Sequence, residues 1–176
     1  MKHSYIFAVA AVIPSSTVQY TSADFSQRTV TPLAESTIIE EYVATCFAGY
    51  PSVAKVSAAL ESSEIEYDEI WGAWHVVWKS EYGEAYYLAT IPDSPKTTPQ
   101  CSFTGFSYAP VSRDHIQSGL LSSLEQAVGK GNVASIDNGF VTCINGLPVS
   151  IVMAKSDNEK EITLITMPSD IGACEN

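Results

Sequence analysis

The sequence is poor in positive charge. Nine lysines and arginines stand against twenty aspartates and glutamates, which gives a formal net charge of −11. Phosphate backbones and anionic lipid headgroups repel such a chain over a Debye length of about 8 Å. We therefore expect neither nucleic acid nor a membrane surface as the partner. The charge suits a cationic protein, although acidity also serves simply to keep an exported protein soluble.

Histidine is scarce too, and the common signatures of catalysis and cofactor binding are missing. The chain has three histidines and contains no C-x-x-C pair, G-x-S-x-G, H-E-x-x-H, phosphate loop or dinucleotide fingerprint. These absences predict no metal, no cofactor and, although the question stays open, no enzyme. The alternative is a small secreted hydrolase that uses Cys46 or Ser52 as its nucleophile, with His75 or His115 as the base.

No apolar run at the N-terminus is long enough to cross a bilayer, which takes about 20 residues. Residues 5–13 are apolar, follow Lys2 and precede a proline and two serines. This order is typical of a secretion signal. We predict that residues 1–23 are a signal peptide, with an alternative cleavage after Ser15 or Ser16, and that the mature protein is secreted or periplasmic with no membrane insertion. The competing interpretation is a cytosolic protein whose first strand is buried.

What the chain does contain is four isolated cysteines, Cys46, Cys101, Cys143 and Cys174. An even number of scattered cysteines indicates two disulfides in an oxidising compartment, whereas four buried free thiols would fit a cytosolic protein. Of the three possible pairings we favour Cys46–Cys101 and Cys143–Cys174, because the second would hold a C-terminal tail that otherwise frays. Each loop spans a few dozen residues, so each bridge is expected to contribute roughly 4 kcal/mol.

Apolar residues at helical spacing predict two to three helices. The first is expected to begin at Thr31 or at a capping box on Thr37 and to end at Gly49. A short helix would follow a cap at Ser52, and another would begin at Ser112. Their buried faces should carry the apolar residues that repeat every three or four positions, which are Ile39, Val43, Cys46, Phe47, Val53, Val56, Leu60, Ile116, Leu120, Leu124 and Val128.

Alternating apolar residues predict the strands. They occupy residues 70–78, 85–91, 101–108, 140–144, 147–153 and 161–167, and Asn145-Gly146 is the preferred turn of a two-residue hairpin. Pro148 lacks an N–H group, so its strand is expected to have a free edge there. We predict one α+β domain over residues 24–176, in which an antiparallel sheet of five to six strands packs with the helices and is held by two disulfides.

The two halves of the chain follow the same order of helix, hairpin and strand. They also share similar strand ends, at residues 88–93 and 164–169. A duplicated αβ unit would explain both features. Chance similarity of two strand ends explains the second equally well.

Aromatic residues gather beside a strongly acidic junction that spans residues 61–69. Trp71, Tyr82 and Tyr86 are candidates for a recognition surface, because tyrosine and tryptophan are enriched where proteins bind one another. The alternative places these aromatic residues in the core, as we expect for Trp74 and Trp78. The acidic candidates for contacting a cationic partner are Glu64, Glu66 and Asp68.

These features predict an exported, non-catalytic binding module, such as an inhibitor or immunity-type protein that acts on a cationic protein. A further alternative is an exported structural or assembly subunit that pairs through the edge near Pro148. The oligomeric state is not indicated by the sequence.

Overall fold

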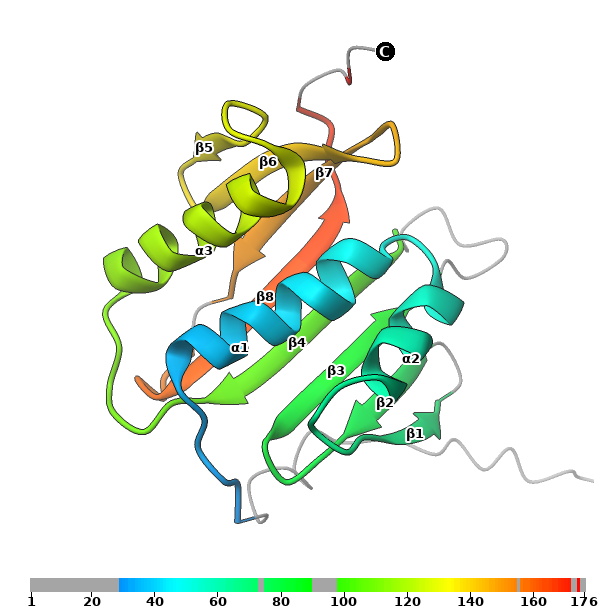
Figure 1. Ribbon diagram of the computed structural model, residues 1–176, viewed down its shortest axis with the longest axis vertical. Helices are drawn as coiled ribbons and strands as arrows, with labels where there is room; N and C mark the ends of the chain where they lie inside the picture. Colours follow the sequence, from blue (N-terminus) through cyan, green and yellow to red (C-terminus); the bar gives the residue numbers. More distant parts are fainter. Residues whose placement is uncertain (1–28, 73–74, 90–97, 155, 172–173, 175–176) are drawn as a thin grey trace, which may run out of the picture.

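The apolar stripes of the helices meet one face of a single antiparallel sheet in the computed structural model (Figure 1). The structure describes residues 29–72, 75–89, 98–154, 156–171 and 174. The predicted signal peptide and Trp74 lie outside these residues. Figure 1 shows α1 over the centre of the sheet, α2 over the side of the first strands and α3 over the opposite side.

Three helical segments precede the strands that they cover. Helix α1, Glu35–Tyr42, continues through a π-helical turn, η2, Val43–Phe47, and is followed by α2, Val53–Glu61; α3 is Arg113–Val128. Of the predicted helical faces, seven residues are buried, and four are only partly buried: Val43, Val53, Ile116 and Val128. The predicted caps of the second and third helices are confirmed, since Ser52 and Ser112 each accept a backbone N–H at 3.3 Å.

The predicted start of the first helix is wrong. Helix α1 begins at Glu35, and neither Thr31 nor Thr37 caps it, because its N-cap is Ala34 with no side-chain hydrogen bond. The preceding residues are instead bound to the sheet: the Thr31 N–H donates to the Glu81 carbonyl and the Leu33 N–H donates to that of Phe106, both at 2.7 Å. These bonds hold the chain extended up to the first turn of the helix.

The sheet has eight strands in the described part of the chain, more than the five to six predicted. They are β1 Asp68–Trp71, β2 His75–Lys79, β3 Gly83–Leu88, β4 Gln100–Phe106, β5 Ala134–Ile136, β6 Gly139–Ile144, β7 Leu147–Met153 and β8 Glu161–Pro168. Two differences account for the miscount. The predicted strand 70–78 is the β1–β2 hairpin, in which the Gly72 N–H donates to the His75 carbonyl at 2.8 Å. Strand β5 has only three residues, too few for an alternating pattern to stand out.

The β6–β7 turn has the predicted geometry, but the edge predicted beside it does not exist. Asn145 and Gly146 have φ angles of 52° and 77°, as a two-residue hairpin turn requires. Strand β7 lies between β6 and β8, and the Ser169 N–H, just after β8, donates to the Pro148 carbonyl at 3.0 Å, so the edge at Pro148 is not free. Pro148 lies opposite Cys143, in the pair next to the one that closes the hairpin. Such pairs alternate with hydrogen-bonded ones, so the missing N–H costs no bond to β6.

The strand order, β1-β2-β3-β4-β8-β7-β6-β5, is symmetric about the central pair β4 and β8. Each half is a four-stranded meander that follows helical segments. In this order β4 corresponds to β8. The two similar segments of the sequence, 88–93 and 164–169, instead begin in β3 and in β8. That similarity therefore joins strands that do not correspond, and a duplicated unit stays a prediction.

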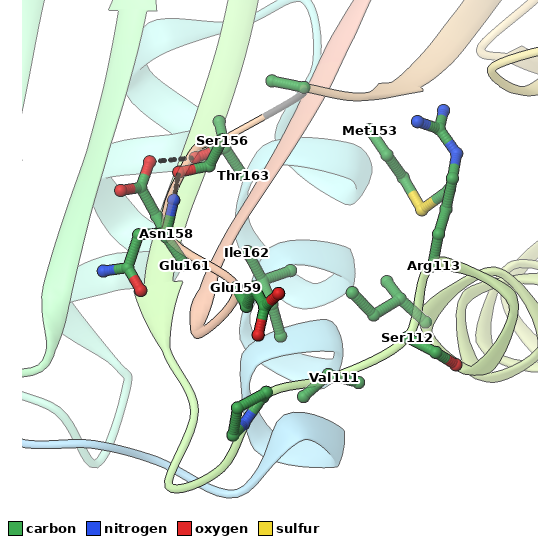
Figure 2. Close-up of a pocket in the computed structure, with 13 residues that line it drawn as sticks. Val111, Ser112, Arg113, Met153, Ser156, Asn158, Glu159, Glu161, Ile162 and Thr163 are labelled. Atoms are coloured by element: carbon green, nitrogen blue, oxygen red, sulfur yellow. Dashed lines mark hydrogen bonds between the residues drawn. The ribbon is translucent and has the colours of Figure 1, made fainter.

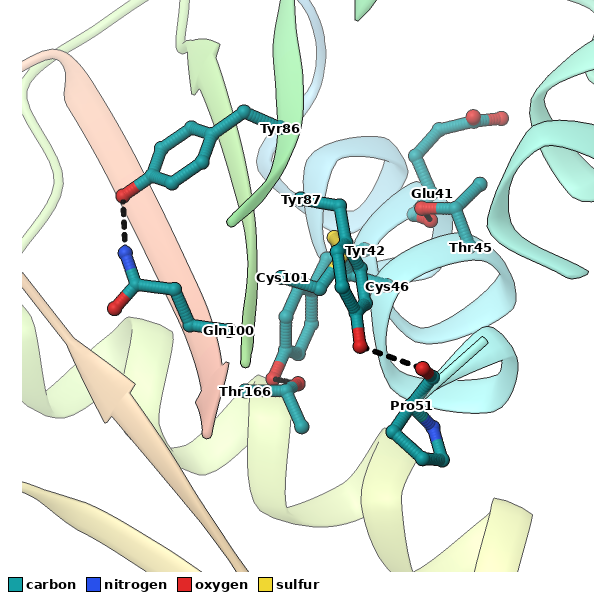
Figure 3. Close-up of a disulfide and its surroundings, with 10 residues drawn as sticks. All are labelled: Glu41, Tyr42, Thr45, Cys46, Pro51, Tyr86, Tyr87, Gln100, Cys101 and Thr166. Carbon is teal, nitrogen blue, oxygen red and sulfur yellow. Dashed lines mark hydrogen bonds between the residues drawn. A yellow bond between two sulfur atoms is a disulfide. The ribbon is translucent and has the colours of Figure 1, made fainter. Parts of the chain in front are cut away.

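Both predicted disulfides are present. Cys46–Cys101 joins η2 to β4 with a Cα–Cα distance of 5.3 Å, and Cys143–Cys174 joins β6 to the C-terminal tail with one of 5.8 Å. The first is fully buried. Figure 3 shows it close to Tyr42, whose hydroxyl shares a hydrogen bond of 2.6 Å with that of Thr166 in β8.

Two structural disulfides indicate an oxidising compartment. Within the described residues, none of the helices is long and apolar enough to cross a membrane.

Helix α1 reaches the sheet closely because β4 carries a glycine beneath it. A Cβ atom added to Gly105 would lie 2.9 Å from Cγ1 of Ile38, which is fully buried. This contact places α1 directly over the middle of the core and leaves the outer strand β1 at the margin of the helical layer.

Candidate functional site

The residues proposed for catalysis have structural roles instead. Cys46 is bonded to Cys101 and fully buried, so it cannot act as a nucleophile, and that part of the hydrolase hypothesis is wrong. The Ser52 hydroxyl accepts the Lys55 N–H as the cap of α2. Nε2 of the exposed His115 lies 3.6 Å from a carboxylate oxygen of Glu35, which is partly buried, and His75 lies in β2. Among the described residues, no cluster of His, Cys, Asp and Glu is arranged to hold a metal ion.

The acidic junction exposes carboxylates that are close together in the sequence. Glu64, Glu66 and Asp68 are exposed, while the residues between them, Ile65 and Tyr67, turn inward. Ile65 is 7% exposed, and the ring of Tyr67 meets that of Phe103 edge to face at 6.4 Å. Because every second side chain is held by the core, the three carboxylates are directed to solvent together.

The start of this segment is fixed by hydrogen bonds. The Ser63 hydroxyl donates to a Glu41 carboxylate oxygen of α1 at 2.8 Å and accepts the Ile65 N–H at 3.1 Å. Burial raises the pKa of the Tyr67 hydroxyl, and the charge of Glu41 raises the pKa further. The acidic segment is therefore anchored to the helical layer at one end and to the sheet at the other.

The segment leads directly into an edge strand that carries an exposed tryptophan. Trp71, at the end of β1, is 66% exposed. Within the described residues β1 pairs only with β2, so its other side offers unpaired backbone groups. We call Glu64, Glu66, Asp68, Glu69 and Trp71 the acidic edge.

Tyr82 flanks the start of the acidic edge from the β2–β3 turn. A hydrogen bond with Glu81 raises the pKa of the Tyr82 hydroxyl, and the charges of Tyr108 and Glu66 contribute to raising that pKa. Glu66 and Tyr108 therefore both lie within electrostatic reach of Tyr82. Tyr108 is 67% exposed and was not among the predicted site residues.

The sequence held no clear signal for Tyr108. Alternation placed Tyr108 inside a strand over residues 101–108, whereas β4 ends at Phe106 and leaves Tyr108 in the following loop. Its exposure follows from where the strand stops, and strand ends are poorly specified by a pattern.

Tyr86 is not part of this surface. It lies in the middle of β3, opposite Val77 and Ser102, with its side chain on the face of the sheet away from the helices. Its hydroxyl accepts a hydrogen bond of 2.9 Å from the Gln100 side-chain amide, as Figure 3 shows. Tyr86 is half-buried, and the structure separates it from the acidic edge.

Comparison with protein-family models, with curated proteins and with solved structures finds no match for this chain. The functional argument therefore depends on the surface itself.

Proposed function

We propose that this protein is a non-catalytic binding module, secreted or periplasmic after removal of residues 1–23, whose acidic edge binds a cationic protein. An inhibitor or immunity-type protein would work in this way. The observation that carries the proposal is the exposed Trp71 on an edge strand whose start and preceding segment expose the carboxylates of Glu64, Glu66 and Asp68.

The two parts of the acidic edge would have different tasks. Carboxylates on the rim of an interface accelerate the encounter with a basic partner, and this effect weakens as salt is added. A large exposed aromatic side chain supplies contact area and slows dissociation. Exposed acids on β1 also discourage a second copy of this chain from pairing with that edge, because like charges would meet.

Charge reversal tests the proposal. The variant Glu64→Lys/Glu66→Lys/Asp68→Lys should associate with the partner captured from the exported fraction at least tenfold more slowly at low salt. The matched control is Asp137→Lys/Asp157→Lys/Asp170→Lys, which makes the same change in net charge at exposed positions elsewhere. Equal association rates for the two triple variants would contradict the proposal.

A further inference from the structure

A cavity of about 420 Å³ opens between the first turn of α3 and the hairpin that joins β7 to β8 (Figure 2). Its floor is apolar: Met153 at the end of β7 and Ile162 at the start of β8 are 7% and 2% exposed. Ile116 of α3, Val111, Pro110 and Ala154 also belong to the apolar part of the lining. Small-molecule sites have volumes of this order and a similar mixture of apolar walls and a few polar groups.

The cavity exists because α3 packs against α1 and β6. Its first turn therefore stands away from the β7–β8 hairpin. Backbone hydrogen bonds join the two walls at one end, since the Val111 N–H donates to the Glu159 carbonyl at 3.2 Å and the Ser107 N–H donates to that of Lys160 at 2.8 Å. The site is thus held open by the fold and needs no rearrangement to admit a ligand.

Three charged side chains line this cavity: Arg113, Glu159 and Glu161. The Glu161 carboxylate already accepts a hydrogen bond of 3.4 Å from the Thr163 hydroxyl, which leaves Arg113 and Glu159 as the two charges for a ligand. The Arg113 guanidinium donates to the Asn138 side-chain oxygen at 3.2 Å, and neither Arg113 nor Glu159 forms an ion pair within the described part of the chain. Figure 2 shows Arg113 beside Met153 on one wall and Glu159 beside Ile162 on the other. A ligand that carries both charges would satisfy both side chains.

We propose that this cavity binds a small zwitterion with an apolar body, of which a short apolar peptide is the simplest example. The ligand's carboxylate would accept hydrogen bonds from Arg113, and its ammonium group would donate to the Glu159 carboxylate. Its apolar side chains would cover Met153 and Ile162, removing both from water. The site is separate from the acidic edge and does not depend on the function proposed for that edge.

Calorimetric titration of the full chain with the dipeptide leucyl-leucine tests the proposal. Acetylating its amine removes the cation, and converting its carboxylate to the amide removes the anion. Each derivative should bind roughly tenfold more weakly than the dipeptide, as expected for a lost hydrogen bond between charged groups. Glu159→Gln should abolish the preference over the acetylated form, and Arg113→Gln should abolish the preference over the amide.

Matched control variants distinguish binding in this cavity from a general effect of changing the protein's charge. Asp157→Asn and Lys160→Gln change the same charges at exposed neighbouring positions that do not line the cavity, and should leave both preferences unchanged. Ala154→Trp, which fills the cavity, should abolish binding while the NMR spectrum stays that of a folded chain. The triple lysine variant of the acidic edge should bind the dipeptide normally. No saturable binding, or preferences that survive Arg113→Gln and Glu159→Gln, would overturn the proposal.

Discussion

At the scale of single residues, the acidic edge depends on which side chains are buried in the core. Ile65 and Tyr67 are drawn inward, so Glu64, Glu66 and Asp68 are left facing water. Trp71 stays exposed because β1 lies at the edge of the sheet, whereas Trp78 in the next strand is 2% exposed beneath the helices. Two tryptophans seven residues apart therefore have opposite roles.

Replacing each tryptophan by alanine should show that Trp78 stabilises the fold and Trp71 does not. Trp71→Ala is expected to change the free energy of unfolding by no more than about 0.5 kcal/mol, as exposed substitutions do. Trp78→Ala should cost about 3–5 kcal/mol, because it leaves a cavity in the core. Urea denaturation of both variants measures the difference. Similar losses of stability would show that Trp71 is part of the core.

A buried hydroxyl gives a second prediction at this scale. Ser102 in β4 is fully buried, and its hydroxyl has no hydrogen-bond partner among the described residues. Ser102→Ala should therefore raise the free energy of unfolding by about 1 kcal/mol. The control is Ser107→Ala, which should lower it by about 1 kcal/mol, because the Ser107 hydroxyl contacts the carbonyl oxygens of Ala109 and Lys160 at 2.5 and 3.1 Å. A lower free energy of unfolding for Ser102→Ala would contradict this and indicate that the Ser102 hydroxyl does form a hydrogen bond.

At the scale of elements, the features that the sequence predicts best are those determined by a few neighbouring residues. The Asn145-Gly146 turn, the caps at Ser52 and Ser112 and the faces of the helices follow from local chemistry, and all were predictable. The start of α1 was not, because hydrogen bonds from Thr31 to the β2–β3 turn and from Leu33 to β4, both distant in the sequence, decide it. The β1–β2 turn was missed because residues 70–78 are apolar on both faces, a pattern that a hairpin and a buried strand share.

The two disulfides should differ in their resistance to reduction. Cys46 and Cys101 are fully buried, whereas Cys143 is exposed. Under native conditions a mild reductant should open Cys143–Cys174 first, and thiol labelling with peptide mapping would detect this order. Earlier labelling of Cys46 and Cys101 would contradict the buried position of that bridge.

The exposed bridge should still stabilise the fold. It closes a loop of 31 residues, so Cys143→Ser/Cys174→Ser should lower the free energy of unfolding by about 4 kcal/mol.

At the scale of the whole molecule, the order of the strands in the sheet could not be predicted from the sequence. The central pair of β4 and β8 joins residues such as Phe103 and Leu164, and no local pattern specifies a partner so far along the chain. The disulfide pairing was predictable because only three pairings exist, whereas the pairing of eight strands has many more solutions. For the same reason the sequence could nominate Glu64, Glu66, Asp68 and Trp71 of the acidic edge, but could not show that Tyr108 follows the end of β4 or that Tyr86 lies in the interior strand β3.

Buried tyrosines should make the molecule sensitive to alkali. Burial raises the pKa of Tyr42, although its hydrogen bond with Thr166 offsets part of this rise, and burial also raises the pKa of Tyr67. Above about pH 10 the unfolded chain loses protons that the folded chain keeps, so the free energy of unfolding should fall as pH rises. Each such tyrosine contributes a slope of up to about 1.4 kcal/mol per pH unit.

Urea denaturation across this pH range measures the slope. The variant Tyr42→Phe should have a shallower slope than the parent protein, since one titrating group is removed. A free energy of unfolding that stays constant above pH 10 would mean that these hydroxyls ionise in the folded state.

The central claim is that the acidic edge is where this protein meets its partner. The most direct measurement is photocrosslinking in the exported fraction, with a photoreactive side chain at position 71 on β1 and, as the control, at position 136 on β5, the opposite edge of the sheet. We predict a crosslink from position 71 to a protein of positive net charge, lost when Glu64, Glu66 and Asp68 are replaced by lysine, and none from position 136. Equal crosslinking from both positions, or capture that is indifferent to the charge reversal, would contradict the account.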